Sequence, residues 1–347
     1  MTKKVLVTGG AGYIGSHTVV ELLDAGYEVV IVDNFSNSHV EVINRIQMIT
    51  GKYPTLYQLD LLEKQLLRDV FLEHEIDGVI HFAGLKAVGE SVKLPLMYYK
   101  ENILSTINLC ELMTEFNVKK LIFSSSATVY DSANKMPVNE KANLNASNPY
   151  GRTKLFIEDI LRDLYISDAE WKITLLRYFN PVGAHKSGLI GESPNGIPNN
   201  LMPYITNVAS GKLDKLQVFG SDYNTPDGTG VRDFIHVVDL AIGHLRAYEK
   251  KNTPGVSTFN MGTGQGHSVL EIIEAFEKAT GINIPYEIVD RRPGDIPVSF
   301  ADVSKAKHEL NWKAERDVIE MCYDAWNWQE KNPDGLTVGR LKQNVLN

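Results

Sequence analysis

Short apolar runs alternate with longer stretches of helical periodicity through the first half of the chain. The runs are largely aliphatic and bounded by Gly, Asp or Ser, which is typical of strands buried on both faces. We expect strands at 4–8, 28–32, 56–59, 79–82, 120–124 and 173–179. Helical patterns lie between them at 13–25, 41–50, 62–73, 96–117 and 150–167. This alternation predicts an α/β fold, a doubly wound parallel sheet of the Rossmann type with helices on both faces.

After residue 180 the pattern loosens. Residues 181–200 are rich in Pro and Gly and predict a long irregular loop, and such loops inside compact chains are usually functional. Helical patterns return at 201–211, 238–250, 268–279 and 317–330. We therefore expect a first domain at 1–180 and a second, smaller α/β substrate domain at 181–335. Within the second domain, about 231–262 should pack back on the first, and 336–347 should form a polar tail.

Composition narrows the class of protein. The 347 residues carry 35 Lys+Arg against 43 Asp+Glu, a net charge of -8, which argues against a general nucleic-acid binder. We expect no membrane span, because no apolar run reaches the ~18 residues that one requires. Two cysteines, Cys110 and Cys322, form no disulfide framework and favour a cytoplasmic location. The nine histidines form no ligand cluster, so no metal site is expected.

A glycine motif suggests a nucleotide site. Gly9, Gly12 and Gly15 follow the first strand and open the first helix, so the backbone can approach a pyrophosphate at the positive end of the helix dipole. Asp33 ends the second strand, where a carboxylate accepts hydrogen bonds from an adenosine ribose and favours NAD over NADP. The alternative is a turn aspartate. Asp60 ends the third strand, where it can lie near the adenine, cap the next helix together with Glu63, or do both.

Candidate catalytic groups lie further along the chain. Tyr150 and Lys154 are four residues apart on one helix face, where an ammonium would lower the pKa of the phenol and suit it to acid–base catalysis. Ser126 closes a run of three serines after the fifth strand, at the end of the sheet where open α/β folds bind ligands. The alternatives are an ordinary amphipathic helix surface and simple turn chemistry.

Together these features resemble the extended short-chain dehydrogenase/reductase family. Longer blocks are similar to its UDP-glucose 4-epimerase branch, from about Lys4 to about Asp334. They are HFAGLKAVGES at 81–91, SSSATVY at 124–130, LRYFNPVGAH at 176–185, IPNNLMPY at 197–204 and GVRDFIHV at 230–237.

The resemblance implies an isomerase that interconverts UDP-glucose and UDP-galactose in galactose metabolism. It uses tightly held NAD and inverts C4 through a transient 4-keto sugar. Tyr150 would take the proton of the 4-hydroxyl, Lys154 would hold the nicotinamide ribose and acidify Tyr150, and Ser126 would bridge Tyr150 and the sugar oxygen. Residues 1–180 would bind NAD and 181–335 the UDP-sugar. Members of the family pair as homodimers through two helices, here 96–117 and 150–167.

The resemblance also implies contact residues. For NAD they are Gly9, Gly12, Tyr13, Ile14, Gly15, Asp33, Asn34, Asp60, Leu61, Phe82, Ala83, Lys86, Ser126, Tyr150, Lys154 and Phe179. For the UDP-sugar they are Lys86, Ser126, Tyr150, Asn180, Asn200, Leu201, Phe219, Arg232, Arg292, Asp295 and Ser299. Two arginines suit a pyrophosphate because guanidinium forks match phosphate oxygens; the alternative is that both are solvated surface charges.

Ser299 bears on the choice of sugar. Some family members carry a tyrosine here, whereas others carry a small residue and accept 2-N-acetylated sugars. A serine leaves room, so we expect UDP-GlcNAc and UDP-GalNAc to be substrates too; the alternative is a surface residue with no effect on the pocket. Two other functions compete. A 4,6-dehydratase needs an Asp-Glu pair where Ala127 and Thr128 stand, and a non-catalytic NAD-binding regulator would not need Ser126, Tyr150 and Lys154 together.

Overall fold

The computed structural model describes residues 3–196, 198, 200–251, 253–292 and 294–336. Its helices are α1 (Tyr13–Asp24), α2 (Glu41–Thr50), α3 (Lys64–Glu73), α4 (Val88–Lys93), α5 (Pro95–Tyr99), α6 (Ser105–Glu115), α7 (Pro149–Ser167), α8 (Leu201–Ala209), α9 (Val237–Glu249), α10 (Val269–Thr280), α11 (Ser304–Glu309) and α12 (Val318–Lys331). A π-helical turn, η1 (Lys100–Leu104), and a 3₁₀ turn, η2 (Ala127–Val129), complete the helical elements.

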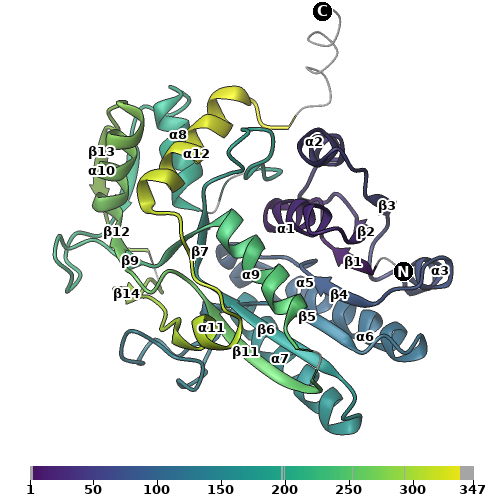
Figure 1. Cartoon of the computed structure of the whole chain (residues 1–347). Coiled ribbons are helices and arrows are strands. Elements are labelled where there is room, and N and C mark those ends of the chain that lie inside the picture. The colour runs from purple at the N-terminus through teal and green to yellow at the C-terminus, as the bar shows by residue number, and fades with distance from the viewer. Residues whose placement is uncertain (1–2, 197, 199, 252, 293, 337–347) are drawn as a thin grey trace, which may run out of the picture.

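The strands form one large sheet and three small ones (Figure 1). The large sheet contains β1 (Lys4–Thr8), β2 (Glu28–Asp33), β3 (Thr55–Gln58), β4 (Gly78–His81), β5 (Lys120–Ser126), β6 (Lys172–Tyr178) and β11 (Gly255–Met261). Its order is β11-β6-β5-β4-β1-β2-β3, and every pairing is parallel. The doubly wound α/β class is therefore confirmed.

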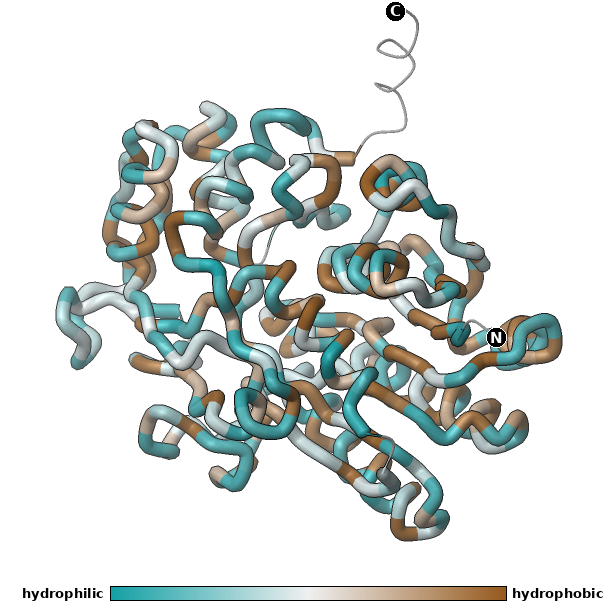
Figure 2. Tube along the Cα trace, in the orientation of Figure 1, coloured by the Kyte–Doolittle hydropathy of each residue, from teal (hydrophilic) through white to brown (hydrophobic). Residues whose placement is uncertain are grey.

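Helices cover both faces of this sheet, and alternate strand residues supply the two cores. Val5, Val7 and Ile31 pack with α1, α2 and α9 on one face. Leu6 and Phe123 pack with α3, α6 and α7 on the other. Figure 2 shows the strands as apolar segments between helices of mixed polarity. Burial on both faces explains why the strands read as continuous rather than alternating apolar runs.

Residues 255–261 form an edge strand that the hydrophobic pattern did not predict. β11 pairs with β6 along its whole length, from Gly255 opposite Lys172 to Met261 opposite Tyr178. Its sequence, GVSTFNM, contains no aliphatic run, so only the pairing reveals it as a strand. The preceding helix, α9, packs against α1 in the core of the same lobe.

The second lobe is built from short strands around α8, α10 and α12. Its strands are β7 (Asn180–Val182), β8 (Leu216–Phe219), β9 (Val231–Arg232), β10 (Phe234–His236), β12 (His267–Ser268), β13 (Tyr286–Val289) and β14 (Val298–Ser299). A separate apolar cluster holds this lobe together. Leu336 is buried and its amide donates to Ser193 Oγ at 3.1 Å; the rest of the expected tail, 337–347, lies outside the described residues.

The single helix expected at 96–117 is wrong in its first part. The segment is divided into α5, η1 and α6, with π-helical hydrogen bonding between Lys100 and Leu104. Such turns occur frequently at functional sites. Here the turn carries Asn102, a buried residue whose side chain reaches towards the carboxyl end of β4.

Candidate active site

The loop between β1 and α1 is shaped to receive a phosphate group. Gly9 has a φ of +69°, and a Cβ there would lie 2.7 Å from the Ala83 nitrogen. A Cβ on Gly15 would lie 2.2 Å from the Gly9 oxygen. Gly12 is the N-cap of α1 and supplies no side-chain cap, and the first turn carries no acidic residue. The N–H groups of this turn, which have no side-chain cap, and the helix dipole therefore fit the pyrophosphate of a dinucleotide such as NAD.

Asp33 has a structural role beside its expected one. Its carboxylate is 8% exposed and accepts hydrogen bonds from the Ala11 amide (2.9 Å), the Phe35 amide (2.9 Å) and Ser38 Oγ (2.7 Å). It thus holds the glycine loop against the end of β2. Because a carboxylate accepts about four hydrogen bonds, one position stays open for a ribose hydroxyl.

Asp60 does not cap α3. Its carboxylate accepts from Asn34 Nδ2 at 2.8 Å and from the Leu62 amide at 2.8 Å. The helix begins only at Lys64, and its N-cap, Glu63, makes no side-chain cap. Asp60 therefore shapes a turn and links the ends of β2 and β3, where the adenosine part of a dinucleotide is expected.

The three candidate catalytic residues lie at the ends of β5 and α7. Ser126 ends β5, and Tyr150 and Lys154 lie in the first two turns of α7, whose N-cap Asn148 accepts from the Gly151 amide at 2.9 Å. A Cβ on Gly151 would lie 2.8 Å from the Thr128 oxygen, so only glycine lets α7 approach the segment after Ser126 this closely. Burial raises the pKa of Tyr150, and a hydrogen bond with Ser126 opposes that shift.

Lys154 is buried against β5. The side chain is 5% exposed, its Nζ donates to Ser124 Oγ at 3.4 Å, and it lies 4.9 Å from the centre of the Phe123 ring. Burial lowers the pKa of Lys154 to about 8. Burial is the largest influence on the pKa of both groups, and the hydrogen bond with Ser126 opposes it at Tyr150. The expected lowering of the Tyr150 pKa by Lys154 stays a prediction.

Asn102 is a site residue that sequence reasoning missed. It is 2% exposed; its Oδ1 accepts from the Leu85 amide at 2.7 Å, and its Nδ2 donates to Leu85 O and to Thr153 Oγ1, both at 3.0 Å. It therefore ties the segment after β4 to α7, one residue before Lys154. An asparagine inside a helical pattern carries no signal of its own, and only the π-helical turn marks it.

The other predicted cofactor residues lie at the start of α1 and after β3, β4 and β6. Tyr13 and Ile14 open α1, and the Tyr13 hydroxyl donates to Gly183 O at 2.6 Å. Leu61 follows β3, and Phe82 and Ala83 follow β4, with the Phe82 ring 4.7 Å from that of His244. Phe179 follows β6 and is 6% exposed.

The predicted UDP residues lie on the second lobe. Asn180 begins β7 and Leu201 begins α8. Arg232 Nη2 lies 3.6 Å from Asp295 Oδ1, and Arg292 Nε lies 3.0 Å from Asp295 Oδ2. Arg292 also covers the Phe219 ring at 4.8 Å. Ser299 pairs with Arg232 between β14 and β9, which brings these residues to one region.

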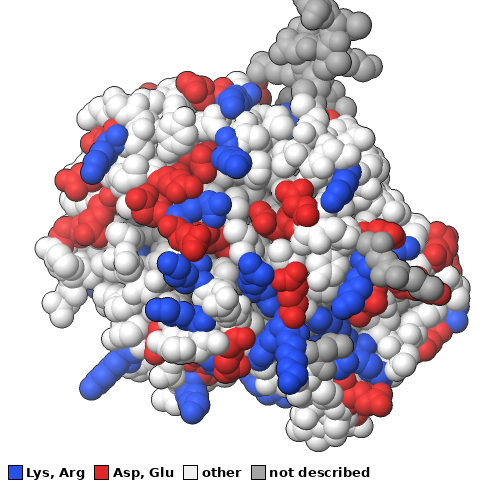
Figure 3. All heavy atoms as spheres, viewed as in Figure 1, with Lys and Arg blue, Asp and Glu red and all other residues white. Residues whose placement is uncertain are grey.

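One ion pair links the two lobes. Lys86, which follows β4, lies 3.3 Å from Glu192, and Glu192 also accepts from Asn200 Nδ2 at 2.7 Å. On the face seen in Figure 3, cationic and anionic side chains are interspersed. Among the described residues no group of three or more His, Cys, Asp or Glu is placed to hold a metal ion, and none of the helices described is long and apolar enough to cross a membrane.

Comparison with known proteins fits this geometry. Residues 6–325 match the family model described as GDP-mannose 4,6 dehydratase. The UDP-glucose 4-epimerase of Bacillus subtilis is 60% identical over 332 residues, which cover 95% of this chain and 98% of that protein. The structure of UDP-glucose 4-epimerase from Bifidobacterium longum with NAD⁺ and UDP is 55% identical with a TM-score of 0.94, and covers 96% of this chain and 100% of that one. The enzyme from Stenotrophomonas maltophila, with NAD and formylated UDP-arabinopyranose, is 53% identical with a TM-score of 0.93, and covers 95% and 99%.

A parallel sheet of this order, a glycine loop after β1 and a Ser, Tyr and Lys group beside it define an extended short-chain dehydrogenase/reductase. Within that class, the chain belongs to the UDP-glucose 4-epimerase family. The expected resemblance is thus confirmed over nearly the whole chain.

Proposed function

We propose that the protein is an NAD-dependent isomerase that inverts C4 of UDP-glucose and UDP-galactose. The observation that carries this proposal is the placement of Ser126 at the end of β5 and of Tyr150 and Lys154 in the first two turns of α7, in a chain that shares 60% identity with an epimerase. Bound NAD would supply a reversible acceptor for the hydride of C4, so that the hydride could return to the opposite face of the sugar ring. The net oxidation state of the sugar is unchanged.

The chain's own residues move the proton. Tyr150 takes the proton of the 4-hydroxyl and gives it back after the sugar has turned, so it must be a base in one half-reaction and an acid in the other. Ser126 forms a hydrogen bond with the phenol of Tyr150. Its hydroxyl can also bind the sugar oxygen and so bridge the two. Lys154 holds a ribose and supplies positive charge. Because burial raises the pKa of Tyr150, the positive charge of bound NAD⁺ is needed to bring it back towards neutrality.

Ligand binding is divided between the two lobes. We assign NAD to 1–180, through the glycine loop and the residues after β2, β3, β4 and β6, and the UDP-sugar to 181–335, with 231–262 returning to the first lobe. Support for the first assignment is the N-terminus of α1, which has no side-chain cap and no acidic residue in its first turn. For the second it is the convergence of Arg232, Arg292 and Phe219, two guanidinium groups and a ring that suit a nucleoside diphosphate.

The competing 4,6-dehydratase reading is not favoured, although the matching family model carries that description. After Ser126 the chain continues with Ala127 and Thr128, so no acid and base stand where dehydration across C5 and C6 would need them. A non-catalytic regulator is also disfavoured, because a buried Lys beside a buried Ser is costly to keep without a catalytic use.

Ser299 extends the proposal to 2-N-acetylated sugars. Its place beside Arg232 puts it next to a residue assigned to the diphosphate, and a hydroxymethyl side chain leaves space that a phenol ring would fill. Purified protein should therefore turn over UDP-GlcNAc. Ser299→Tyr should remove that activity and retain turnover of UDP-galactose. No turnover of UDP-GlcNAc by the unaltered protein would contradict this extension alone.

We further propose a cytoplasmic homodimer. The described cysteines, Cys110 and Cys322, are both buried and unpaired. Several apolar side chains on α4, α5, η1 and α7 are exposed, among them Leu96 at 82% and Phe156 at 45%. Because single chains rarely leave such a group uncovered, a second copy is the fitting partner.

The deciding experiment is turnover of all four UDP-sugars by the purified protein. A coupled assay should detect UDP-glucose formed from UDP-galactose, whereas a dehydratase would form a 4-keto-6-deoxy product and a regulator neither. Tyr150→Phe should retain NAD and lose most turnover. Unchanged turnover in Tyr150→Phe would exclude the phenol from the mechanism.

A further inference from the structure

Three cations that the family resemblance implies as contacts of the UDP-sugar are each paired with a carboxylate of the protein. Arg232 and Arg292 share Asp295, which the proposed function already assigns to the ligand. Lys86 is paired with Glu192, which has no assigned role. Glu192 thus faces a cation implied to bind ligand, as Asp295 does. Its position therefore needs a functional explanation.

Glu192 lies between groups that bind ligand in the proposed function. Its Oε1 is 3.3 Å from Lys86 Nζ on the first lobe and accepts from Asn200 Nδ2, at the N-terminus of α8, at 2.7 Å. Tyr13, the first residue of α1, and Glu192 line one small cavity. Burial raises the pKa of Tyr13, and the charge of Glu192 raises it further. The Glu192 carboxylate therefore lies beside the glycine loop and binds the Lys86 ammonium and the Asn200 amide at the same time.

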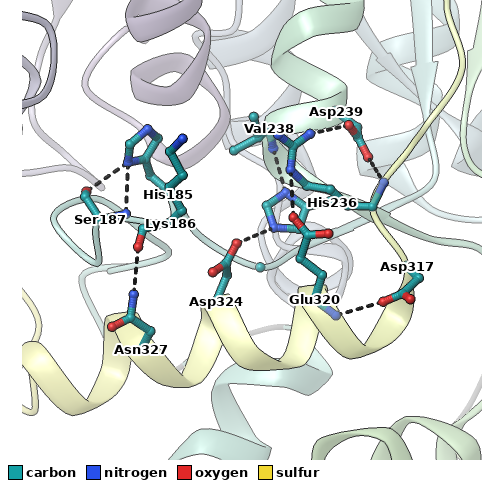
Figure 4. A network of polar contacts seen from close by, with 12 residues as sticks. His185, Lys186, Ser187, His236, Val238, Asp239, Asp317, Glu320, Asp324 and Asn327 are labelled. Carbon is teal, nitrogen blue, oxygen red and sulfur yellow. Dashed lines mark hydrogen bonds and ion pairs between the residues drawn. The ribbon is translucent and has the colours of Figure 1, made fainter. Parts of the chain in front are cut away.

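The backbone of Glu192 is fixed by α12. Trp328 Nε1 donates to Glu192 O at 3.3 Å, and a Cβ on Gly191 would lie 2.4 Å from Trp328 Cγ. Just upstream, Asn327 Nδ2 donates to Lys186 O at 3.0 Å, as Figure 4 shows. Because these contacts hold the backbone of the loop to α12, rotation of its side chain can take Glu192 away from its partners.

A diphosphate and this carboxylate compete for the same partners. Two anions beside one ammonium repel each other. The Glu192 side chain is only 11% exposed, which limits the screening of its charge by water, although Lys86 is 42% exposed. We propose that Glu192 is a resident counter-ion, which the diphosphate of the UDP-sugar displaces from Lys86 and Asn200. Its return to them lowers the affinity for the nucleotide and speeds release of the product. This inference rests on the proposed function of the site.

Binding of UDP to the protein as purified, with its own dinucleotide, tests the proposal by calorimetry and stopped flow. Glu192→Gln retains an oxygen that accepts from Asn200 but removes the charge. We expect it to bind UDP about fivefold tighter and to release it correspondingly more slowly. The gain should shrink in about 0.5 M salt, where charges are screened. In a Lys86→Met background, the same substitution should change affinity little.

Glu309→Gln is the matched control, because it also breaks a Lys–Glu pair, with Lys250 at 3.0 Å, but lies on α11 outside the site. Its UDP affinity should equal that of the unaltered protein. Equal or weaker binding by Glu192→Gln, or a gain that persists without Lys86, would overturn the counter-ion role. Failure of the unaltered protein to bind UDP would instead overturn the proposed function. Glu192→Ala, which should also bind more tightly, serves if the glutamine variant does not fold.

Discussion

Glu158 and Arg177 form a bidentate ion pair in the interior of the first lobe. Arg177 Nε donates to Glu158 Oε1 at 2.9 Å and Nη2 donates to Oε2 at 2.6 Å, with the side chains 1% and 0% exposed. Ser125 Oγ also donates to Glu158, at 2.6 Å. Glu158 lies one helical turn after Lys154, and Ser125 lies between the two serines that contact Lys154 and Tyr150. The pair therefore fixes α7 against β5 and β6 directly behind the candidate catalytic residues.

Removal of one partner of this ion pair should lower the free energy of unfolding more than replacement of both partners by apolar residues. Glu158→Gln leaves Arg177 buried without a counter-charge, and we expect the free energy of unfolding to fall by ~3–5 kcal/mol. The double variant Glu158→Leu with Arg177→Met removes both charges and should recover most of that stability. Turnover should nevertheless stay at least tenfold low in the double variant, because α7 has lost its register. Denaturant unfolding and initial rates measure the two effects, and full activity of the double variant would show that the pair has no positioning role.

Lys154 should lower the free energy of unfolding of the nucleotide-free protein. Burial lowers its pKa from 10.5 to about 8, so the folded state disfavours the ammonium. Lys154→Met should therefore raise the free energy of unfolding of nucleotide-free protein at pH 7 by ~1–3 kcal/mol, while turnover falls by at least a hundredfold. The unfolded state binds the extra proton between pH 8 and 10.5, so stability of the unaltered protein rises with pH in that window. The difference between the two proteins should shrink there, and a constant difference in urea titrations would contradict this account.

The close contact at Gly15 predicts the behaviour of the glycine loop. A Cβ at this position would meet the Gly9 oxygen at 2.2 Å and the Gly10 Cα at 2.9 Å. Both are backbone atoms, so the loop itself would have to move. Gly15→Ala should therefore displace the loop and reduce the NAD retained after gel filtration by at least tenfold, as read by absorbance after denaturation. Gly89→Ala on α4 is the control, because a Cβ there has no heavy atom within 4 Å. Equal retention of NAD by both variants would remove the loop from the cofactor site.

The exposed apolar side chains on α5 and α7 predict the oligomeric state. Leu96 is 82% exposed and Phe156 is 45% exposed, and Phe156 stacks on Tyr99 at 6.0 Å. Leu96→Asp with Phe156→Asp should convert a dimer into monomers in light scattering, because burying two carboxylates opposes association. Leu72→Asp on α3, where Leu72 is 58% exposed, should leave the mass unchanged. A monomeric unaltered protein would refute the proposed dimer.

Local pattern alone predicted most of the central sheet. The strands at β1, β2, β4, β5 and β6 and the helices α1, α2 and α7 were expected within a few residues of their bounds. The reason is that burial on both faces imposes continuous apolar runs. The apolar pattern did not predict β11, because the strand contains buried polar residues that are hydrogen-bonded to residues distant in the sequence. Asn260, for example, accepts from the Tyr130 hydroxyl at 2.6 Å and donates to Val138 O at 2.9 Å.

The sequence by itself determined the features that residues close to one another in the chain encode. These are the period of apolar residues, the spacing of Gly9, Gly12 and Gly15, and the four-residue step from Tyr150 to Lys154. The tertiary structure alone decided which groups meet across the fold. Lys86 and Glu192 are separated by 106 positions, and no periodicity relates them. The same holds for the burial that sets the pKa values of Tyr150 and Lys154, since desolvation depends on packing from several elements at once and not on the residues beside them in sequence.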